Sequence, residues 1–284
     1  MSSRDDILTP GRVAVITGAA AGIGAACAQA FARLGMGLCL FDRDADALDR
    51  LSAQLGTLTE VVTVTGDVTS AEDLARLADT AFERFGDVAV LMNNAGITAG
   101  AGPWDDLAGW RHQLEVNLFS IVTAQSLFVP RMLQQDRRSA IVNLGSKEGI
   151  TTPPGNAAYS VAKAGVKVLT EQLAHELRSA GGDKVSAHLF VPGYTWTPMN
   201  IALKPKGTQK PDEAWTAEQL ADYFLGRLRK GDFYILCPDN VVTQEMDAKR
   251  IEWAAHDMID NRPALSRWHP DWADKFARFM RAQD

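Results

Sequence analysis

The feature that most constrains the fold is an alternation, over the first two thirds of the chain, of short apolar runs with longer amphipathic stretches. The short runs are rich in β-branched residues, which favour strands, and the longer stretches repeat apolar residues at helical spacing. Strands that are apolar on both faces are typical of a parallel sheet covered by helices on both sides. We therefore expect an α/β fold with a doubly wound parallel sheet, the Rossmann fold. The expected strands are residues 13–17, 38–41, 61–65, 88–92, 141–144, 185–191 and 233–237.

The same periodicity predicts the helices and the division of the chain. Ser70 and Asp73 form a capping arrangement that opens one helix, and Gly35 follows the end of another. No linker or internal repeat divides the sequence, so we expect residues 1–284 to form a single domain. Within it, residues 193–230 are the expected substrate-loop region and residues 241–284 a helical, Trp-rich C-terminal extension that breaks at Pro263. The other expected helices are residues 22–34, 107–134, 157–180 and 216–230.

Charge and composition exclude several classes of partner and site. The formal net charge is −6, which argues against nucleic acid and anionic membrane surfaces as partners. No apolar run approaches the roughly 20 residues that span a bilayer, and residues 1–12 lack the apolar segment of a secretory signal. The three cysteines are too widely spaced for a disulfide framework or a zinc site, so we expect buried free thiols and a cytoplasmic protein. They are Cys27, Cys39 and Cys237.

A glycine-rich turn follows the first expected strand and opens the first expected helix. It reads Thr17-Gly18-x-x-x-Gly22-Ile23-Gly24. Glycine lets the chain turn sharply, lets the backbone approach a pyrophosphate, and lets the helix pack closely on the sheet. Free N–H groups at the helix N-terminus attract the phosphates. Its position between strand and helix predicts a dinucleotide-binding turn rather than an ordinary structural turn.

Asp42 ends the second expected strand, roughly 20 residues beyond the glycine turn. An acidic residue here accepts hydrogen bonds from the adenosine ribose of NAD and repels the 2′-phosphate of NADP. Arg43 follows directly and weakens this preference. We expect NAD as the preferred cofactor and NADP as a possible second one. The alternative is that Asp42 only caps a turn.

Tyr159 and Lys163 are four residues apart near the start of an expected helix, so they share one face. An ammonium group beside a phenol favours the phenolate and lowers its pKa from about 10. A phenol tuned in this way exchanges a proton with an alcohol or a carbonyl near neutral pH. Ser146 closes the fifth strand, at the edge of the sheet where ligands bind, and its hydroxyl is placed to hold the substrate oxygen.

Taken together and in this order, these residues resemble the short-chain dehydrogenase/reductase family. The resemblance covers roughly residues 10–200, and single motifs such as Tyr159-x-x-x-Lys163 would be weak alone. The further matching elements are Asp67, Asn93-Asn94-Ala95-Gly96, Asn117, Ser146 and Pro192-Gly193.

The resemblance implies a role for each matching residue. Tyr159 is the general acid/base, Lys163 lowers its pKa and binds the nicotinamide ribose, and Ser146 orients the substrate oxygen. Asn117 holds a water that links Lys163 to solvent. We expect Asn93 to stabilise the sheet rather than to contact a ligand. The implied cofactor contacts, besides the glycine turn and Asp42, are Asp67, Val68, Asn94, Ala95, Gly96, Pro192, Gly193, Thr195 and Thr197.

The sequence departs from the family pattern in two places. Lys147 and Glu148 follow Ser146 where small residues are usual, and we expect both charges to be solvated. The C-terminal third lacks the glycine-rich ending common in tetrameric members. We therefore expect a homodimer through the helices that contain Asn117 and Tyr159, with a homotetramer as the alternative.

Aromatic and sulfur side chains gather in and beside the loop after the sixth strand. Tyr194, Trp196, Met199 and Trp215 either shape the substrate pocket or pack beneath the loop as core. The tryptophans of the C-terminal extension either cap the site or bury against a second subunit. They are Trp253, Trp268 and Trp272.

Other chemistries find no support in the sequence. Ser146 lacks the Gly-x-Ser-x-Gly context of a hydrolase nucleophile. No metal set is visible, because the histidines are isolated: His112, His175, His188, His256 and His269. We therefore predict an oxidoreductase that transfers a hydride between a nicotinamide cofactor and a small-molecule secondary alcohol or ketone. The alternatives are NAD-assisted epimerisation or dehydration, in which the hydride is returned, and a non-catalytic dinucleotide sensor.

Overall fold

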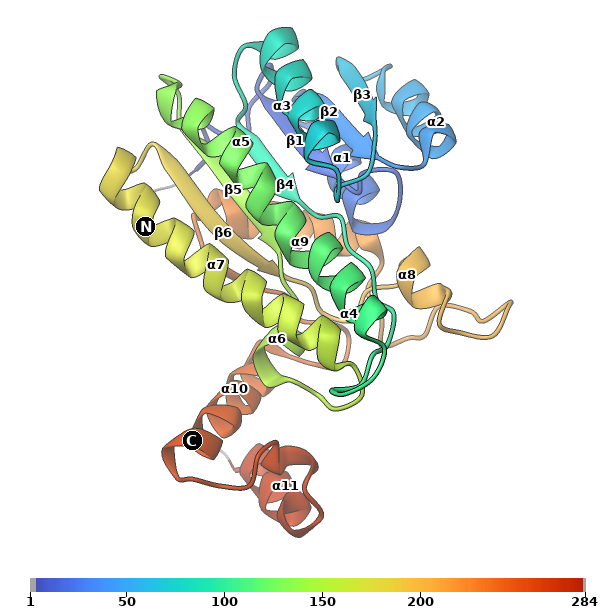
Figure 1. The fold of residues 1–284 in the computed structure, drawn as a ribbon, viewed down its shortest axis with the longest axis vertical. Coiled ribbons are helices and arrows are strands. Elements are labelled where there is room, and N and C mark those ends of the chain that lie inside the picture. Colours follow the sequence, from blue (N-terminus) through green and yellow to red (C-terminus); the bar gives the residue numbers. More distant parts are fainter. Residues whose placement is uncertain (1–3, 283–284) are drawn as a thin grey trace.

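The computed structural model describes residues 4–282 and contains a seven-stranded, wholly parallel sheet with the strand order β3-β2-β1-β4-β5-β6-β7 (Figure 1). The order reverses direction between β3 and β4, which lie on opposite sides of β1, as in a doubly wound sheet. The predicted fold class is confirmed. The strands are β1 (Val13–Thr17), β2 (Gly37–Asp42), β3 (Val61–Thr65), β4 (Val90–Asn93), β5 (Ser139–Leu144), β6 (Val185–Val191) and β7 (Tyr234–Leu236).

Helices cover both faces of the sheet. Neighbouring residues along a strand point to opposite faces, so alternate residues pack against different helices. In β1, Ile16 packs in a core cluster with α1, α2 and α9, whereas Val15 packs in another with α3, α5 and α7. β1 thus has apolar residues for both layers, which is why its sequence is continuously hydrophobic. These helices are α1 (Gly22–Arg33), α2 (Ala45–Leu55), α3 (Ala71–Phe85), α5 (Ser120–Gln134), α7 (Ala157–Gly181) and α9 (Ala217–Arg229).

Local capping explains several of the helix boundaries. The Ser70 side chain accepts from the Asp73 amide, as the sequence predicted, and so opens α3. Thr216 and Gln219 form a reciprocal capping box at the start of α9. Three helices were not predicted: α2, α6 (Glu148–Thr151) and α8 (Pro198–Ile201). The last two have four residues each, too few to show a helical period.

The expected long helix over residues 107–134 consists of α4 (Leu107–Leu114), a π-helical turn (Glu115–Phe119) and α5. By length and composition alone this stretch could cross a membrane, since its mean hydropathy reaches 1.2. No apolar run of that length was expected from the sequence. Ile121, Ala124 and Phe128 on its inner face are buried in the core of the protein. Figure 1 shows the stretch lying along the sheet beside α7. Packing on the sheet therefore accounts for much of its apolar character.

The C-terminal extension projects from the sheet domain (Figure 1). It contains α10 (Gln244–Ile259), two short 3-10 turns (Ser266–Trp268 and Pro270–Trp272) and α11 (Ala273–Arg281). The indole of Trp253 donates to Ser266 Oγ over 2.7 Å and packs against the rings of Trp272, Phe276 and Phe279. Trp253 and Trp272 therefore belong to a small core within the extension, whereas Trp268 is 36% exposed.

Candidate active site

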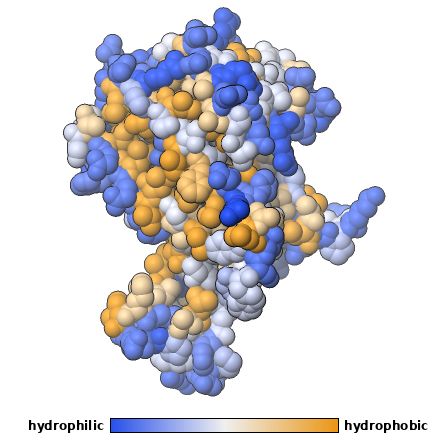
Figure 2. Space-filling model, viewed as in Figure 1, coloured by the Kyte–Doolittle hydropathy of each residue, from blue (hydrophilic) through white to orange (hydrophobic). Residues whose placement is uncertain are grey.

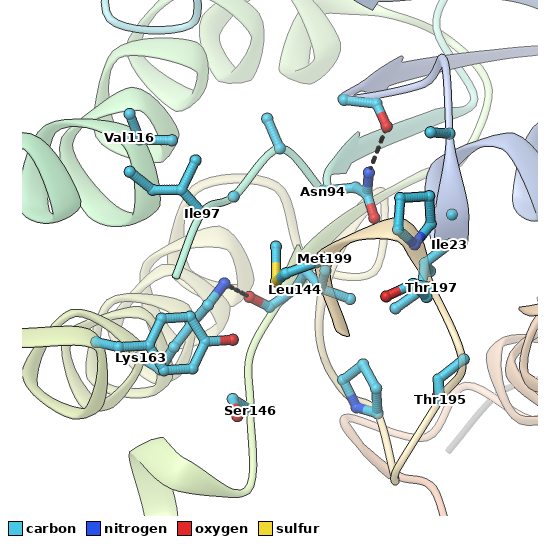
Figure 3. Close-up of a pocket in the computed structure, with 18 of the residues that line it drawn as sticks. Ile23, Asn94, Ile97, Val116, Leu144, Ser146, Lys163, Thr195, Thr197 and Met199 are labelled. Carbon is cyan, nitrogen blue, oxygen red and sulfur yellow. Dashed lines mark hydrogen bonds between the residues drawn. The ribbon is translucent and has the colours of Figure 1, made fainter. Parts of the chain in front are cut away.

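A cavity of about 580 Å³ lies at the carboxyl edge of the sheet, where the loops after β1 to β6 converge (Figure 3). It runs from the glycine turn and Asp42 to Ser146, Tyr159 and Lys163. Its volume falls within the roughly 300–1,000 Å³ of small-molecule and cofactor sites. Ligands of doubly wound sheets bind at this edge beside the strand-order reversal.

The glycine turn leaves no room for side chains between β1 and α1. Gly18 has a φ of +64°, and a Cβ on it would lie 2.7 Å from the Ala95 Cα. A Cβ on Gly24 would lie 2.2 Å from the Gly18 carbonyl oxygen. Helix α1 begins without a side-chain cap, so its first N–H groups remain available to an anion. This arrangement fits the pyrophosphate of a dinucleotide.

Two residues predicted to contact the cofactor, Thr17 and Gly24, do not line the cavity. Thr17 Oγ1 accepts from the Asn94 and Ala95 amides over 3.1 and 3.2 Å. The Asn94 side chain donates back to the Thr17 and Gly18 carbonyls over 2.9 and 2.8 Å (Figure 3). Thr17 therefore ties the end of β1 to the segment after β4, and Gly24 allows α1 to approach the turn. Both residues support the cavity wall without lining it.

Asp42 and Asp67 lie at the opposite end of the cavity from the tyrosine. Asp42 accepts from the Ala20 amide over 2.9 Å and from the Asp44 amide over 3.2 Å. It therefore caps the turn, as the alternative held, and also lines the cavity beside Arg43. Two hydrogen bonds from Thr69 to Asp67 hold the pKa of that carboxyl below its usual value.

Lys163 is almost completely buried in α7, and its ammonium group donates to the Leu144 carbonyl over 2.7 Å (Figure 3). The same nitrogen lies 5.7 Å from the centroid of the Tyr159 ring. Burial lowers the pKa of Lys163 to about 8. The spacing of four residues thus brings the phenol and the ammonium together on one helix face, as predicted.

Burial also governs Tyr159, raising its pKa to about 12. A hydrogen bond with the Ser146 side chain acts in the opposite direction, and the negative charge of Glu148 raises the pKa further. The lowering of the Tyr159 pKa predicted from Lys163 is therefore not found in the protein alone, where burial raises this pKa. A positive charge added to this buried site would favour the phenolate.

Asn117 lies in the π-helical turn, completely buried, and does not line the cavity. Its side-chain oxygen accepts from the Ile97 amide over 2.9 Å, and its side-chain nitrogen donates to the Ile97 carbonyl over 3.0 Å. It lies just behind Gly96, where an added Cβ would come within 2.9 Å of its oxygen and 3.8 Å of the Lys163 nitrogen. Asn117 therefore fixes the wall next to the lysine.

The prediction that Asn93 stabilises the sheet is confirmed by its contacts. Asn93 donates to Asn143 over 2.8 Å, and Asn143 donates to Thr170 over 3.0 Å. The chain of side-chain bonds joins β4, β5 and α7 within the buried core. It holds the two strands whose ends carry the cavity wall.

The expectation that the charges after Ser146 are solvated is wrong for Lys147. Its ammonium lies 2.6 Å from Asp247 on α10 and 3.9 Å from Asp239, and both carboxylates are nearly buried. Glu148 lines the cavity, and one of its carboxyl oxygens is buried. Sequence patterns do not predict these contacts, because Lys147 and Asp247 are a hundred positions apart.

The aromatic loop residues divide between the two roles that the sequence left open. Tyr194 and Met199 line the cavity, whereas Trp215 packs beside the core and contacts Tyr223. Sequence reasoning also missed His112, an isolated histidine that the folded chain brings to the cavity wall near Asp67. Further lining residues that were missed are Ala21, Phe41, Gly66, Ile97, Val116, Leu144, Gly145, Pro198 and Asn200. The remaining predicted cofactor residues and Ser146 all line the cavity.

The prediction that the cysteines are buried free thiols is confirmed. The three cysteines are buried and free, and burial raises the pKa of each. Among residues 4–282, no group of three or more His, Cys, Asp or Glu side chains is arranged to hold a metal ion.

Comparison with known proteins gives consistent matches. The profile of a family described as short chain dehydrogenase matches residues 12–207. The chain is 36% identical to 1-deoxy-11-beta-hydroxypentalenate dehydrogenase of Streptomyces exfoliatus over 228 residues, 79% of this chain and 82% of the relative. A short-chain dehydrogenase/reductase from Burkholderia phymatum, solved with NAD, superposes with a TM-score of 0.80 at 32% identity over 89% of this chain and 96% of that one. An alcohol dehydrogenase from Thermococcus sibiricus, solved with 5-hydroxy-NADP, gives 0.72 at 25% identity over 82% and 98%.

Proposed function

This chain belongs to the short-chain dehydrogenase/reductase family and is an NAD(P)-dependent oxidoreductase acting on alcohol or ketone substrates, and we propose that Tyr159 is its general acid/base. We propose further that it prefers NAD and acts on small to medium, partly apolar secondary alcohols. The observation that carries the proposal is the cluster of Ser146, Tyr159 and the buried Lys163 at one end of the dinucleotide-sized cavity. A sensor would need the glycine turn but not this proton-transfer cluster.

A bound nicotinamide dinucleotide supplies the centre that accepts or donates the hydride. In the oxidation direction, Ser146 donates a hydrogen bond that holds the substrate oxygen, and Tyr159 removes the hydroxyl proton. In reduction Tyr159 returns that proton to the carbonyl oxygen. Because burial raises the pKa of Tyr159, the neutral phenol is favoured until positive charge enters the site. In the oxidation direction, in which Tyr159 must act as a base, the positive charge of the oxidised cofactor would favour its phenolate.

Lys163 has two roles in this proposal, both supported by its position. Its ammonium would favour the phenolate of Tyr159 and would donate to the nicotinamide ribose of a bound cofactor. The Leu144 carbonyl fixes its place through a 2.7 Å hydrogen bond. Burial lowers its pKa to about 8, which lets it exchange a proton near neutral pH. The water that Asn117 is expected to hold between Lys163 and solvent stays a prediction, since the buried Asn117 side chain pairs with Ile97.

The proposed NAD preference rests on the Asp42 carboxylate at the adenosine end of the cavity. The Asp42→Ala variant should raise the efficiency with NADP relative to NAD, because it removes a charge that repels the 2′-phosphate. Steady-state kcat/KM with each cofactor measures this ratio in both proteins. Glu218→Ala, an exposed change at the start of α9, is the control. Better turnover of the unaltered protein with NADP would refute the preference.

A panel of secondary alcohols and ketones, assayed with each cofactor by nicotinamide absorbance and by product analysis, tests the reaction. The proposal predicts stoichiometric change in absorbance and conversion of alcohol to ketone or the reverse. Product formed without net change in absorbance would instead indicate epimerisation or dehydration. Cofactor binding without any product would indicate a sensor.

We also propose a homodimer through the outer faces of α5 and α7. Figure 2 shows apolar side chains gathered over these helices, and Val122, Val161 and Val168 are 42%, 50% and 53% exposed. Light scattering after size exclusion should give twice the chain mass, and Val161→Glu with Val168→Glu should give a monomer. Dimers retained by the double variant would refute this interface. The cytoplasmic location stays a prediction, which fractionation of the producing cells tests.

A further inference from the structure

The two charged residues after Ser146, Lys147 and Glu148, differ in whether neighbouring groups compensate their charge. Lys147 is held by Asp247 on α10, and Asp239 lies beside the pair. Asp239 in turn accepts from the amides of Tyr194 and Val242 over 3.1 and 2.7 Å. The positive charge of Lys147 is thus neutralised by two nearly buried carboxylates.

Glu148 receives no such compensation. Within residues 4–282, its Oε2 atom is buried and has no hydrogen-bond partner. The same residue lines the cavity next to Ser146, and its charge acts on Tyr159. A buried polar group without a hydrogen-bond partner costs about 1–3 kcal/mol. When such a group lies in the wall of a binding cavity, we expect it to accept a hydrogen bond from a ligand.

We infer that Glu148 is a specificity-determining residue whose carboxyl group pairs with a second hydroxyl of the substrate, near the carbon that exchanges hydride. The inference rests on the proposed function, since it places the reacting oxygen at Ser146 and Tyr159. The Glu148 amide donates to Ser146 Oγ over 3.1 Å, so the two residues are locked together at the substrate end. A diol or polyol therefore satisfies both Ser146 and Glu148 at once.

The chemistry of the carboxyl group distinguishes a hydroxyl from other partners. A hydroxyl donates to a carboxylate and accepts from a carboxylic acid, so it pairs with either form of Glu148. An ammonium pairs well only with the charged form, which burial disfavours. An apolar substituent leaves the buried oxygen without a partner, and a substrate carboxylate is repelled by the charged form.

Calorimetric titration of the NADH-loaded protein tests the inference without turnover, because a reduced cofactor cannot accept hydride from an alcohol. The ligands are cyclohexanol, cis-1,2-cyclohexanediol and cis-2-aminocyclohexanol. The unaltered protein should bind the diol about tenfold more tightly than cyclohexanol, the difference expected for one additional hydrogen bond. Glu148→Leu should abolish this preference, whereas Glu148→Gln, which keeps an acceptor, should retain most of it.

Glu176→Leu, an exposed change far along α7, is the matched control and should leave the preference intact. Equal affinity for diol and cyclohexanol in the unaltered protein, no measurable binding of either, or an unchanged preference in Glu148→Leu would overturn the inference. Tighter binding of the amino alcohol than of the diol would overturn the choice of a hydroxyl. Failure of the alcohol panel with the diol preference intact would count against the proposed function alone.

Discussion

The two ends of the cavity are built in different ways. At the cofactor end, the backbone of one continuous motif, Gly18 to Gly24, turns so tightly that added Cβ atoms would overlap main-chain atoms. At the substrate end, Lys147 and Asp247 meet from segments a hundred residues apart, through buried charges. Local backbone geometry therefore fixes the first end, and long-range polar side-chain contacts fix the second.

Because of this difference, the two ends of the cavity should tolerate different kinds of substitution. A backbone cradle fails when volume is added, since its neighbours cannot move away. A buried ion pair fails when one charge is removed, because the partner remains buried and uncompensated. The cofactor end should thus be sensitive to size and the substrate end to charge.

The largest effect is expected for Gly24→Ala, whose Cβ would meet the Gly18 carbonyl at 2.2 Å. The turn must open, so NADH affinity should fall on the order of 1,000-fold, about 4 kcal/mol. Fluorescence titration measures the affinity, and circular dichroism confirms that the variant is folded. Gly226→Ala in α9 is the control, because its Cβ would meet nothing within 4 Å, and it should stabilise the helix by up to about 1 kcal/mol. Unchanged NADH affinity in Gly24→Ala would show that the cofactor end is not sensitive to added side-chain volume.

A smaller effect is expected for Asp247→Asn at the substrate end. It leaves Lys147 without its closest counter-charge and should lower the free energy of unfolding by about 3 kcal/mol. Urea denaturation followed by fluorescence measures the change. The exposed pair of Arg33 and Asp222 provides the control, and Asp222→Asn should cost less than about 1 kcal/mol. Equal losses in both variants would show that burial of the charges does not matter.

A still smaller effect concerns His188 in β6, another buried polar contact of the second half. Its ring bonds Ser186 Oγ and the Asp232 carbonyl, both over 2.8 Å, and burial lowers its pKa to about 4. The unfolded chain binds this proton from about pH 6.5 downward and the folded chain does not, so stability falls as the pH drops. Between pH 7 and 5 this group should account for about 2 kcal/mol.

Urea denaturation of the protein and of His188→Gln at both pH values isolates this contribution. The glutamine does not titrate, so the pH dependence of the variant should be weaker by that amount. Identical pH dependence in the two proteins would show that His188 already carries a proton in the fold.

Local sequence signals predicted the fold and much of the candidate site. The strand β1 was predicted at its observed bounds, because apolar and β-branched residues run without interruption from Val13 to Thr17. The cavity position of the glycine turn and the approach of Tyr159 to Lys163 also followed from spacing alone.

The remainder depends on contacts that spacing does not encode. The π-helical turn that carries Asn117 has no period of its own, so the sequence predicted one uninterrupted helix. His112 reaches the cavity only because α4 crosses the sheet edge, and Lys147 is neutralised only because α10 returns to it. The pKa of Tyr159 was predicted in the wrong direction because desolvation depends on the whole surrounding fold.

The most direct test of the account is the Tyr159→Phe variant, assayed with the fastest alcohol of the panel, with Tyr234→Phe on the exposed edge of the sheet as control. The account predicts that kcat falls at least about 1,000-fold, within the range of general acid–base catalysis, while NADH affinity and the control's turnover stay the same. Turnover of Tyr159→Phe close to that of the unaltered protein would contradict it, since no phenol would then be needed to move the proton.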